Sequence, residues 1–462
     1  MITSATRLIA GLLVTTAIGI LLLACLPARK RRLAYLEVAA LGFALGLGMH
    51  TLYMFLIGLA GIRYTLPVCL APLAPLAVVA TVRIRRSGLF ATLRREGEAG
   101  RLRTVTRISI TVMGLLLAWK IFVCFFTAVN CPTTFDDSVT IWNYKAKVFY
   151  YEGLVKDPLH QDFFGGHTPK YPNAVPLFKT WLVLSMDRWN EAGINLLCPI
   201  IFLCTGLLIY SNMRTRAPPW LALATSYVAM STPLFAFHAG FAYADMIVGF
   251  YFAAGAIYID RWLRSRDSAD FIVASLLFCT AGWVKDEGLY LFAFSILPGL
   301  FLYTLFNREN RPAVLRMGLL VIAIMGFLLG PWIACKLLYN FPLAVVSGDY
   351  HKLEFHPDAF DLFRQLLFTG GDYNILWVAC AGTFLLYALL PRKRHMIFPV
   401  ASTILAVGCV LAPFVLTPLF KWLAVGTTLN RAMLTIAPWA TFTAGRIVAE
   451  WLEQNRKAGD TS

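Results

Sequence analysis

Charged residues are scarce in this chain. Asp, Glu, Lys and Arg make up 14% of its 462 residues, whereas 58% are hydrophobic. Soluble domains carry about 25% charged residues, so this composition excludes a soluble enzyme. With a mean hydropathy of +0.67, the sequence describes an integral membrane protein.

Clustered metal-binding or disulfide-forming residues are also missing. The sequence has ten cysteines, but no pair has Cys-x-x-Cys spacing. Most stand alone inside apolar runs, as Cys124, Cys198, Cys204 and Cys279 do. We therefore expect small core residues and no disulfide framework or Cys/His metal site.

Long apolar runs are what the sequence does contain. Runs of about 18 to 24 residues are long enough to cross a hydrocarbon layer as helices. We predict an all-α polytopic membrane protein with about 13 transmembrane helices. The predicted spans are residues 8–27, 34–60, 66–83, 107–129, 190–211, 217–236, 242–263, 270–284, 287–306, 315–337, 373–391, 395–416 and 430–450. Residues 1–25 resemble a signal peptide, but the basic residues 29–32 favour an uncleaved anchor.

Basic clusters fall at alternate turns of these spans, which predicts the orientation of the chain. Short loops rich in Lys and Arg stay in the cytoplasm, so we expect the N-terminus outside and the C-terminus inside a bacterial inner membrane. The net charge of +16 then reflects these loops and anionic membrane lipids, and we expect no nucleic-acid partner. The clusters are Arg29 to Arg32, Arg83 to Arg107, Arg214 with Arg216, Arg261 to Arg266, Arg308 to Arg316, and Arg392 to Arg394.

Three parts of the chain differ in character. Residues 1–106 form a three-helix extension with a basic linker, residues 107–450 carry nearly all of the unusual polar residues, and residues 451–462 form a cytoplasmic tail. Residues 130–189 and 338–372 are expected to form two long outer loops. Loops of this length are usually functional, and the aromatic content of the first predicts that it is ordered.

An acidic pair opens the first outer loop. Asp136 and Asp137 precede a segment that predicts a helix over 136–152, ended by Gly153. Helical spacing puts Asp137 and Lys145 on one face, with a carboxylate and an ammonium directed at the same space. The alternative is that Asp136 caps the helix and that the lysines are solvated.

A short apolar segment, residues 174–187, follows the polar stretch from Gly165 to Asn173. A membrane crossing here would place Arg214 and Arg216 outside. We therefore predict an amphipathic helix at the outer interface, with Trp181 and Trp189 at the level of the lipid headgroups.

Three further polar sites fall where apolar spans meet the outer surface. They are Tyr243-Ala244-Asp245, Lys285-Asp286-Glu287 and Asn430-Arg431. Ionisable groups near membrane depth are rare and tend to mark functional sites. The alternatives are a solvated turn for residues 285–287 and an interfacial anchor for Arg431.

These polar segments, in this order, resemble the bacterial GT-C glycosyltransferases, in the branch related to protein mannosyltransferases and lipid A aminoarabinose transferases. The resemblance covers about residues 107–450 and implies a GT-C-like transmembrane body with juxtamembrane helices on its outer face. It implies transfer of one sugar, with inversion, from a polyprenyl-phosphate donor to a lipid, glycan or protein acceptor at the outer face of the inner membrane. It is carried by Phe135-Asp136-Asp137, the run from Trp142 to Lys147, Tyr171-Pro172 with Pro176, Tyr243-Ala244-Asp245, the run from Lys285 to Gly288, and Asn430-Arg431 with Pro438.

The resemblance also implies roles for these residues. Asp137 or Asp136 suits the general base that the attacking hydroxyl needs. Relatives often have Asp-Glu or a single acid here, and the spacing to Trp142 and Lys145 favours Asp137. Positive charge for the leaving phosphate is expected from Lys145, Lys147, Lys285 and Arg431. The other expected substrate contacts are His167, Tyr171, Asp245, Asp286 and Glu287.

We expect no cofactor and no dedicated metal site, although Asp136, Asp137 and Asp245 would suit a divalent ion if they met. Two other classes fit a polytopic chain. A transporter uses intramembrane acids, but near the bilayer midplane, whereas the polar clusters here lie at span ends. An envelope polysaccharide polymerase or ligase shares the lipid-linked donor but usually relies on arginine-rich outer loops.

Overall fold

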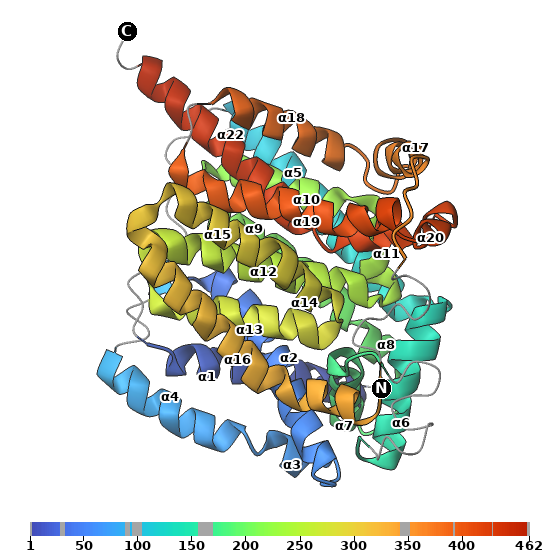
Figure 1. The fold of residues 1–462 in the computed structure, drawn as a ribbon. Helices are drawn as coiled ribbons and strands as arrows, with labels where there is room; N and C mark the ends of the chain where they lie inside the picture. The colour runs from blue at the N-terminus through green and yellow to red at the C-terminus, as the bar shows by residue number, and fades with distance from the viewer. Residues whose placement is uncertain are drawn as a thin grey trace.

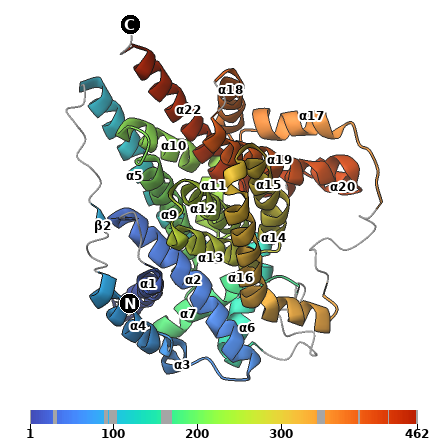
Figure 2. The same ribbon diagram turned by 60° about the vertical axis from the view of Figure 1, so that its left-hand side comes forward.

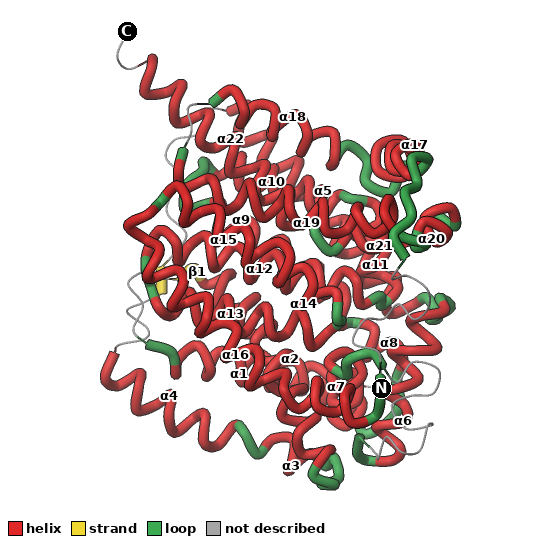
Figure 3. The backbone as a smooth tube through the Cα atoms, viewed as in Figure 1, coloured by secondary structure: helices red, strands yellow, loops and turns green. Residues whose placement is uncertain are grey.

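The computed structural model describes residues 2–27, 33–87, 93–94, 104–155, 170–341, 352–390, 393–426 and 428–459. Within these ranges the chain consists of helices joined by loops and turns (Figures 1 and 3), with one parallel pair of two-residue strands, β1 (Leu33–Ala34) and β2 (Leu93–Arg94). The predicted all-α fold is confirmed at this level.

The helices follow the apolar runs of the sequence. In chain order they are α1 (Ile2–Cys25), α2 (Tyr35–Leu59), α3 (Leu66–Leu70), α4 (Leu73–Ser87), α5 (Thr104–Asn130), α6 (Tyr144–Glu152), α7 (Ala174–Met186), α8 (Glu191–Asn195), α9 (Leu197–Met213), α10 (Pro219–Ser231), α11 (Pro233–Phe241), α12 (Ala244–Ser265), α13 (Ser268–Val284), α14 (Glu287–Leu291), α15 (Leu297–Phe306), α16 (Arg311–Leu338), α17 (Ala359–Arg364), α18 (Leu376–Leu389), α19 (Ile397–Leu416), α20 (Phe420–Ala424), α21 (Thr428–Leu434) and α22 (Ala437–Gly459). Shorter π or 3₁₀ turns are η2 (Asp137–Asn143), η3 (Phe292–Ile296), η4 (Arg308–Asn310), η5 (Gln365–Thr369) and η6 (Arg394–Met396).

Nine helical segments among the described residues are long and apolar enough to cross a membrane, as in a multi-pass membrane protein. The pair α10 and α11, bent by 64° at its break, makes a tenth if it counts as one span. Helices α13 and α18 are shorter, with 17 and 14 residues. At 1.5 Å per residue they rise about 26 and 21 Å, less than a hydrocarbon layer of about 30 Å. The structure thus supports nine or ten of the thirteen predicted spans.

The long helices run back and forth between two ends of one bundle (Figure 1). One end carries α6, α8, α17 and α20, and we refer to it as the α6 end. Helix α12 lies at the centre, with every residue from Ala244 to Leu263 buried. Helix α5 is mostly exposed, since its buried residues are Leu117, Cys124 and Ala128. A mostly exposed apolar helix is what contact with lipid requires.

Helices α1 and α2 pack tightly together and against the rest of the bundle. A Cβ atom on Gly46 would lie 1.8 Å from the backbone oxygen of Thr15, so the two backbones touch where only glycine fits. Helix α2 also packs against α7, α9 and α13, and Figures 1 and 2 show it next to α1. The N-terminal extension is therefore in direct contact with the part of the chain that carries the polar segments.

A buried ionic network lies at the end of the bundle opposite α6. Arg261 of α12 pairs with Glu37 of α2 and, at 3.1 Å, with Asp270 of α13. Arg446 of α22 pairs at 2.8 Å with Asp260 of α12. The sequence pattern predicted that the unusual polar residues lie at the outer ends of the spans. The network around Arg261 and Arg446 lies at the other end and corrects that prediction.

Candidate functional site

The acidic loop begins with a π-helical turn that is fixed to the end of α11, just before α12. Segment η2 opens at Asp137 and continues directly into α6, so the predicted helix is present up to its left-handed cap at Gly153. The Ser138 hydroxyl donates a hydrogen bond of 2.8 Å to the backbone oxygen of Phe241, and Ser138 has no exposed surface. This bond sets the position of Asp137, its neighbour, relative to α11 and α12.

Arg431 of α21 joins two carboxylates from distant parts of the chain. Its Nη2 forms an ion pair with Asp137 and lies 3.0 Å from Oδ2 of Asp245. Its guanidinium lies 5.0 Å from the centre of the Tyr243 ring, which stacks at 4.5 Å on the buried His238. Burial opposes the charged form of Arg431, but the two carboxylates outweigh it and raise the pKa.

Lys285 extends this set of charges. Its Nζ lies 2.8 Å from Oδ1 of Asp245 and 2.9 Å from Oε1 of Glu287. Burial lowers the pKa of Lys285, whereas Asp245 and Glu287 raise it by more, so the amine stays charged. Asp137, Arg431, Asp245, Lys285 and Glu287 thus form one continuous series, which we call the ion chain.

A second polar group lies beside the ion chain. Asp286 pairs with Lys336 of α16, and burial raises the pKa of Asp286 to about 6 even though Lys336 opposes this shift. The Lys145 amine donates to the backbone oxygen of Tyr171 at 2.9 Å and lies 3.5 Å from Oδ1 of Asn173. Burial, aided by the charge of Lys336, lowers the pKa of Lys145 to about 7.

The lowered pKa of Lys145 predicts a pH-dependent effect on stability. Between pH 7 and 10.5 the unfolded chain binds more protons at this residue than the folded protein, so stability rises with pH by at most about 1.4 kcal/mol per unit. We expect Lys145→Met to be more stable than wild type at pH 6, and this gain to shrink by pH 9. Thermal unfolding in detergent measures it.

Lys147 provides the matched control, because it lies on the same helix with an exposed side chain, 5.8 Å above the Trp189 ring. Lys147→Met should differ from wild type by the same amount at both pH values. A Lys145→Met gain that is equal at pH 6 and pH 9 contradicts the prediction.

The other predicted site residues lie apart from the ion chain or beside it. Asp136 is exposed and accepts a hydrogen bond of 3.3 Å from the Thr140 hydroxyl. Tyr171 lies close to the ion chain, with Lys285 5.9 Å from its ring centre. His167 falls outside the described residues.

Two local expectations were wrong. Lys145 does not share a space with Asp137, because the wider π turn changes the helical spacing and the Lys145 amine turns to Tyr171 and Asn173. Helix α7 is buried along nearly its whole length and is not an interfacial helix. Trp181 donates to the backbone oxygen of Gly11 in α1 at 3.1 Å, so it lies in the protein interior.

Sequence reasoning missed several members of the site. Lys336 was placed within the span 315–337 without a role, although a lysine at the end of an apolar run is a usable signal. Tyr243, which lies against Arg431, was part of a predicted polar segment but had no role assigned, and His238, which stacks on Tyr243, was not singled out. Asn430 donates to Asp372 and accepts from the Tyr373 hydroxyl through its backbone oxygen, which anchors the helix that carries Arg431.

The described residues bring no group of three or more His, Cys, Asp and Glu into an arrangement that suits a metal ion. Asp137 and Asp245 do approach the same point, but Arg431 occupies it. Asp136 is exposed and takes no part in this ion pairing. A cation already fills the place where a divalent ion would bind these two aspartates.

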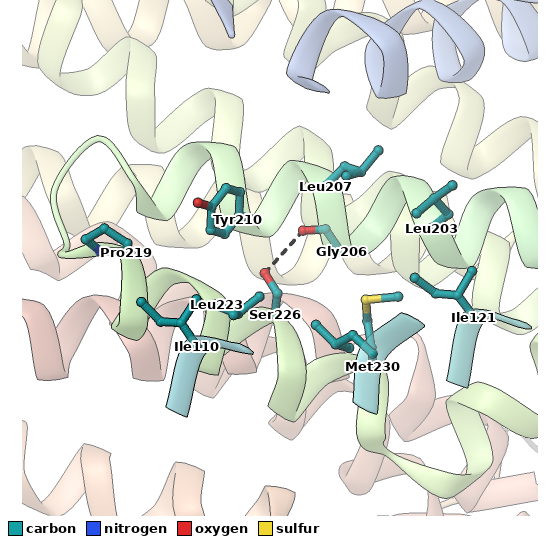
Figure 4. A pocket seen from close by; sticks show the side chains of 11 residues that line it. Ile110, Ile121, Leu203, Gly206, Leu207, Tyr210, Pro219, Leu223, Ser226 and Met230 are labelled. Atoms are coloured by element: carbon teal, nitrogen blue, oxygen red, sulfur yellow. Dashed lines mark hydrogen bonds between the residues drawn. The ribbon is translucent and has the colours of Figure 1, made fainter. Parts of the chain in front are cut away.

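Two apolar cavities lie along α5, the helix that leads into the acidic loop. The first, of about 200 Å³, is enclosed by α5, α9 and α10 (Figure 4), where the Ser226 hydroxyl turns to the backbone oxygen of Gly206. The second, of about 300 Å³, lies between α5 and α11. Its lining residues are Trp119, Lys120, Val123, Cys124, Thr127, Ala236, Phe237, Gly240 and Phe241.

The second cavity adjoins the acidic loop through aromatic rings. Phe135, directly before the acidic pair, contacts Phe237 and Phe241 with ring centres 5.0 and 4.9 Å apart. Both phenylalanines also line the cavity. Trp119 on its rim is 64% exposed, so the cavity faces the lipid side of α5. The cavity therefore lies beside Phe135, two residues before Asp137 of the ion chain.

Comparison of the chain with protein-family models, with curated proteins and with solved structures finds no match. The function of the chain therefore has to be inferred from the arrangement of the site itself.

The Ser138 contact provides a further prediction. Ser138→Ala removes the donor from the partly buried carbonyl of Phe241, and an acceptor left without a partner costs about 1 to 3 kcal/mol. We expect a lower melting temperature in detergent. Ser109→Ala is the control, because that exposed hydroxyl bonds at 3.0 Å within its own helix. Equal melting temperatures for the two variants contradict the prediction.

Proposed function

We propose that this protein is an inverting glycosyltransferase of the GT-C type, which moves one sugar from a polyprenyl-phosphate donor to an acceptor at the outer face of a bacterial inner membrane. One observation carries the proposal. A loop aspartate, Asp137, joins the ion chain with Arg431 and Lys285 at one end of an apolar bundle, close to an apolar cavity beside α5.

The chemistry assigned to these groups follows from their charges. The acceptor oxygen attacks the anomeric carbon, the bond from that carbon to the phosphate oxygen breaks, and Asp137 takes the acceptor proton. The leaving lipid phosphate is a stable anion that needs positive charge, not a general acid. Arg431 and Lys285 supply that charge from positions fixed by Asp245.

Arg431 also offers a way to release the base. In the resting protein its guanidinium is shared between Asp137 and Asp245. A phosphate group binds arginine strongly because two parallel N–H bonds match its oxygens. A bound donor phosphate competes with Asp137 for Arg431 and thereby leaves the carboxylate available for the proton of the acceptor.

The cavities along α5 suit the lipid part of the donor. Each buried CH₂ group contributes about 0.8 kcal/mol, so a polyprenyl chain held along α5 supplies much of the binding energy. Phe135 places this apolar path next to the acidic pair. The lipid, glycan or protein acceptor then approaches Asp137 from the aqueous side of the α6 end.

The proposed topology has thirteen crossings, with the N-terminus outside and the C-terminus in the cytoplasm. Helices α13, α18 and α22 complete the number: α13 and α18 are short, α18 is largely exposed, and α22 carries charged residues in its last turns. Arg214, Arg261, Arg308 and Arg394 then belong to the cytoplasmic side. The α6 end, with the ion chain, faces outward.

A transporter is the second candidate, because the break between α10 and α11 is a feature of helices that line transport paths. The centre of the bundle argues against it. Between Met246 and Ile257, α12 is fully buried and carries no Asp, Glu, Lys or Arg. A transport site would place its polar groups there, near the midplane.

The direct test is consumption of polyprenyl-phosphate-linked sugars by purified protein in lipid. We expect one member of a panel of such donors to be consumed, with release of polyprenyl phosphate, when extracts of envelope lipids and glycans are supplied as acceptors. Proteoliposome uptake of the same sugars is the parallel measurement. Uptake without consumption of any donor overturns the glycosyltransferase and supports the transporter.

A further inference from the structure

Helix α2 reaches the helix end that carries Lys285. Trp283 of α13 donates its indole N–H to the Thr51 hydroxyl oxygen at 3.1 Å, and neither residue has exposed surface. The hydroxyl hydrogen of Thr51 is directed at its own helix, 2.9 Å from the backbone oxygen of Leu47. The oxygen lone pair thus remains for Trp283, and the bond links two helices inside the bundle.

An aromatic cluster extends this contact to a third helix. The Phe55 ring lies 4.9 Å from the Trp283 ring and 6.0 Å from the Trp332 ring of α16. The two indoles are 6.0 Å apart and nearly perpendicular, at 70°. All three rings are at most 1% exposed. One turn of α2, from Thr51 to Phe55, therefore packs against α13 and α16 together.

Both tryptophans sit next to lysines of the site. Trp283 is two residues before Lys285, and Trp332 is one helical turn before Lys336, whose amine lies 5.4 Å above its ring. Lys285 is the cap of α13 and still bonds through its backbone N–H to Ala281 at 3.2 Å. A shift of Trp283 or Trp332 therefore moves the lysine attached to the same helix end.

The backbones leave little room for such a shift. A Cβ atom on Gly48 would lie 2.2 Å from the Thr280 hydroxyl oxygen, so α2 and α13 are in direct contact one turn before the tryptophan. A Cβ atom on Gly288 would lie 2.4 Å from the backbone of Ala281, which holds the start of α14 against α13. The turn that carries Lys285 is therefore held by α2 on one side and by α14 on the other.

We propose that Thr51 and Phe55 are positioning residues that set the places of Lys285 and Lys336, so that α2 forms one wall of the site. Helix α2 lies outside residues 107–450, the part that resembles glycosyltransferases, and this assigns a role to the N-terminal extension. Kinetic tests of this role rest on the proposed function, whereas hydrogen–deuterium exchange tests it independently of any activity.

The variants are Thr51→Val, which keeps the shape but removes the acceptor, and Thr51→Ser, which restores it. Thr205→Val is the matched control, because that buried hydroxyl bonds at 2.9 Å within its own helix. We expect hydrogen–deuterium exchange of residues 284–292 to become faster in Thr51→Val, to recover in Thr51→Ser and to stay unchanged in Thr205→Val. Unchanged exchange in Thr51→Val overturns the positioning role, whatever the activity.

Turnover then tests the link to Lys285. We expect Thr51→Val to lower kcat/KM about tenfold, since small displacements of positioned groups cost one to two orders of magnitude. In a Lys285→Met background, Thr51→Val should have a clearly smaller effect, because the part of its effect that passes through that amine is already lost. Equal effects of Thr51→Val in both backgrounds overturn the proposal. Faster exchange in a protein that consumes no donor keeps α2 as a positioning element and rejects the glycosyltransferase.

Discussion

Asp137→Asn is expected to lower kcat for sugar transfer by about 10² to 10⁴, the usual contribution of a general base. Asparagine has nearly the same shape and keeps an oxygen that accepts a hydrogen bond from Arg431, so the ion chain loses a charge but not its geometry. What disappears is the group that takes the proton. Donor binding, measured by retention of polyprenyl phosphate, should change much less than kcat.

A substitution of the neighbouring Asp136 tests whether the loss of transfer is specific to Asp137 or follows from any loss of negative charge in the loop. Asp136 is exposed and bonds to Thr140, so Asp136→Asn removes an equal charge outside the ion chain. We expect a less than tenfold effect from it. If Asp136→Asn abolishes transfer and Asp137→Asn does not, Asp136 is the base and Asp137 serves to hold Arg431.

Asp245→Ala is expected to destabilise the protein by about 3 to 5 kcal/mol, the typical cost of removing one partner from a buried ion pair. The Asp245 side chain is 5% exposed and contacts both Lys285 and Arg431. Without it, Lys285 keeps only Glu287 and Arg431 keeps only Asp137 as a carboxylate partner. Transfer should be lost as well, because neither cation keeps its position.

Asp361→Ala is the matched control for this stability effect. Its carboxylate is 83% exposed and lies 3.9 Å from Arg364 on the same helix, a geometry in which an ion pair contributes little. Thermal unfolding in one detergent compares the two variants. An Asp245→Ala protein as stable as Asp361→Ala contradicts a structural role for the ion chain.

Much of this architecture was accessible from the sequence, because apolar runs define helices directly. The polar segments at 137, 245, 285 and 431 were expected at one face, and the structure brings them into contact. The pairing itself was not accessible. Sequence spacing favoured Lys145 as the partner of Asp137, but spacing within a helix cannot show that Arg431 arrives from a distant one.

The errors have a common physical origin. Hydropathy reports that a residue avoids water, but it does not tell lipid from protein interior, and so Trp181 was assigned to the headgroups although α1 covers it. The same limit applies to Arg261. It was counted as a loop arginine that fixes orientation, yet its buried guanidinium pairs with Glu37 on a helix 224 residues earlier.

The long separation between Asp137 and Arg431, 294 residues, has a consequence for biosynthesis. A ribosome completes the acidic loop and α12 well before it makes the arginine that joins their two carboxylates. Until α21 is made, Asp137 and Asp245 lack the positive charge of Arg431. Lys285, directly after α13, is the first cation available to pair with Asp245. The ion chain is therefore completed only by the C-terminal part of the protein, and a chain that ends before residue 428 leaves Asp137 and Asp245 without Arg431.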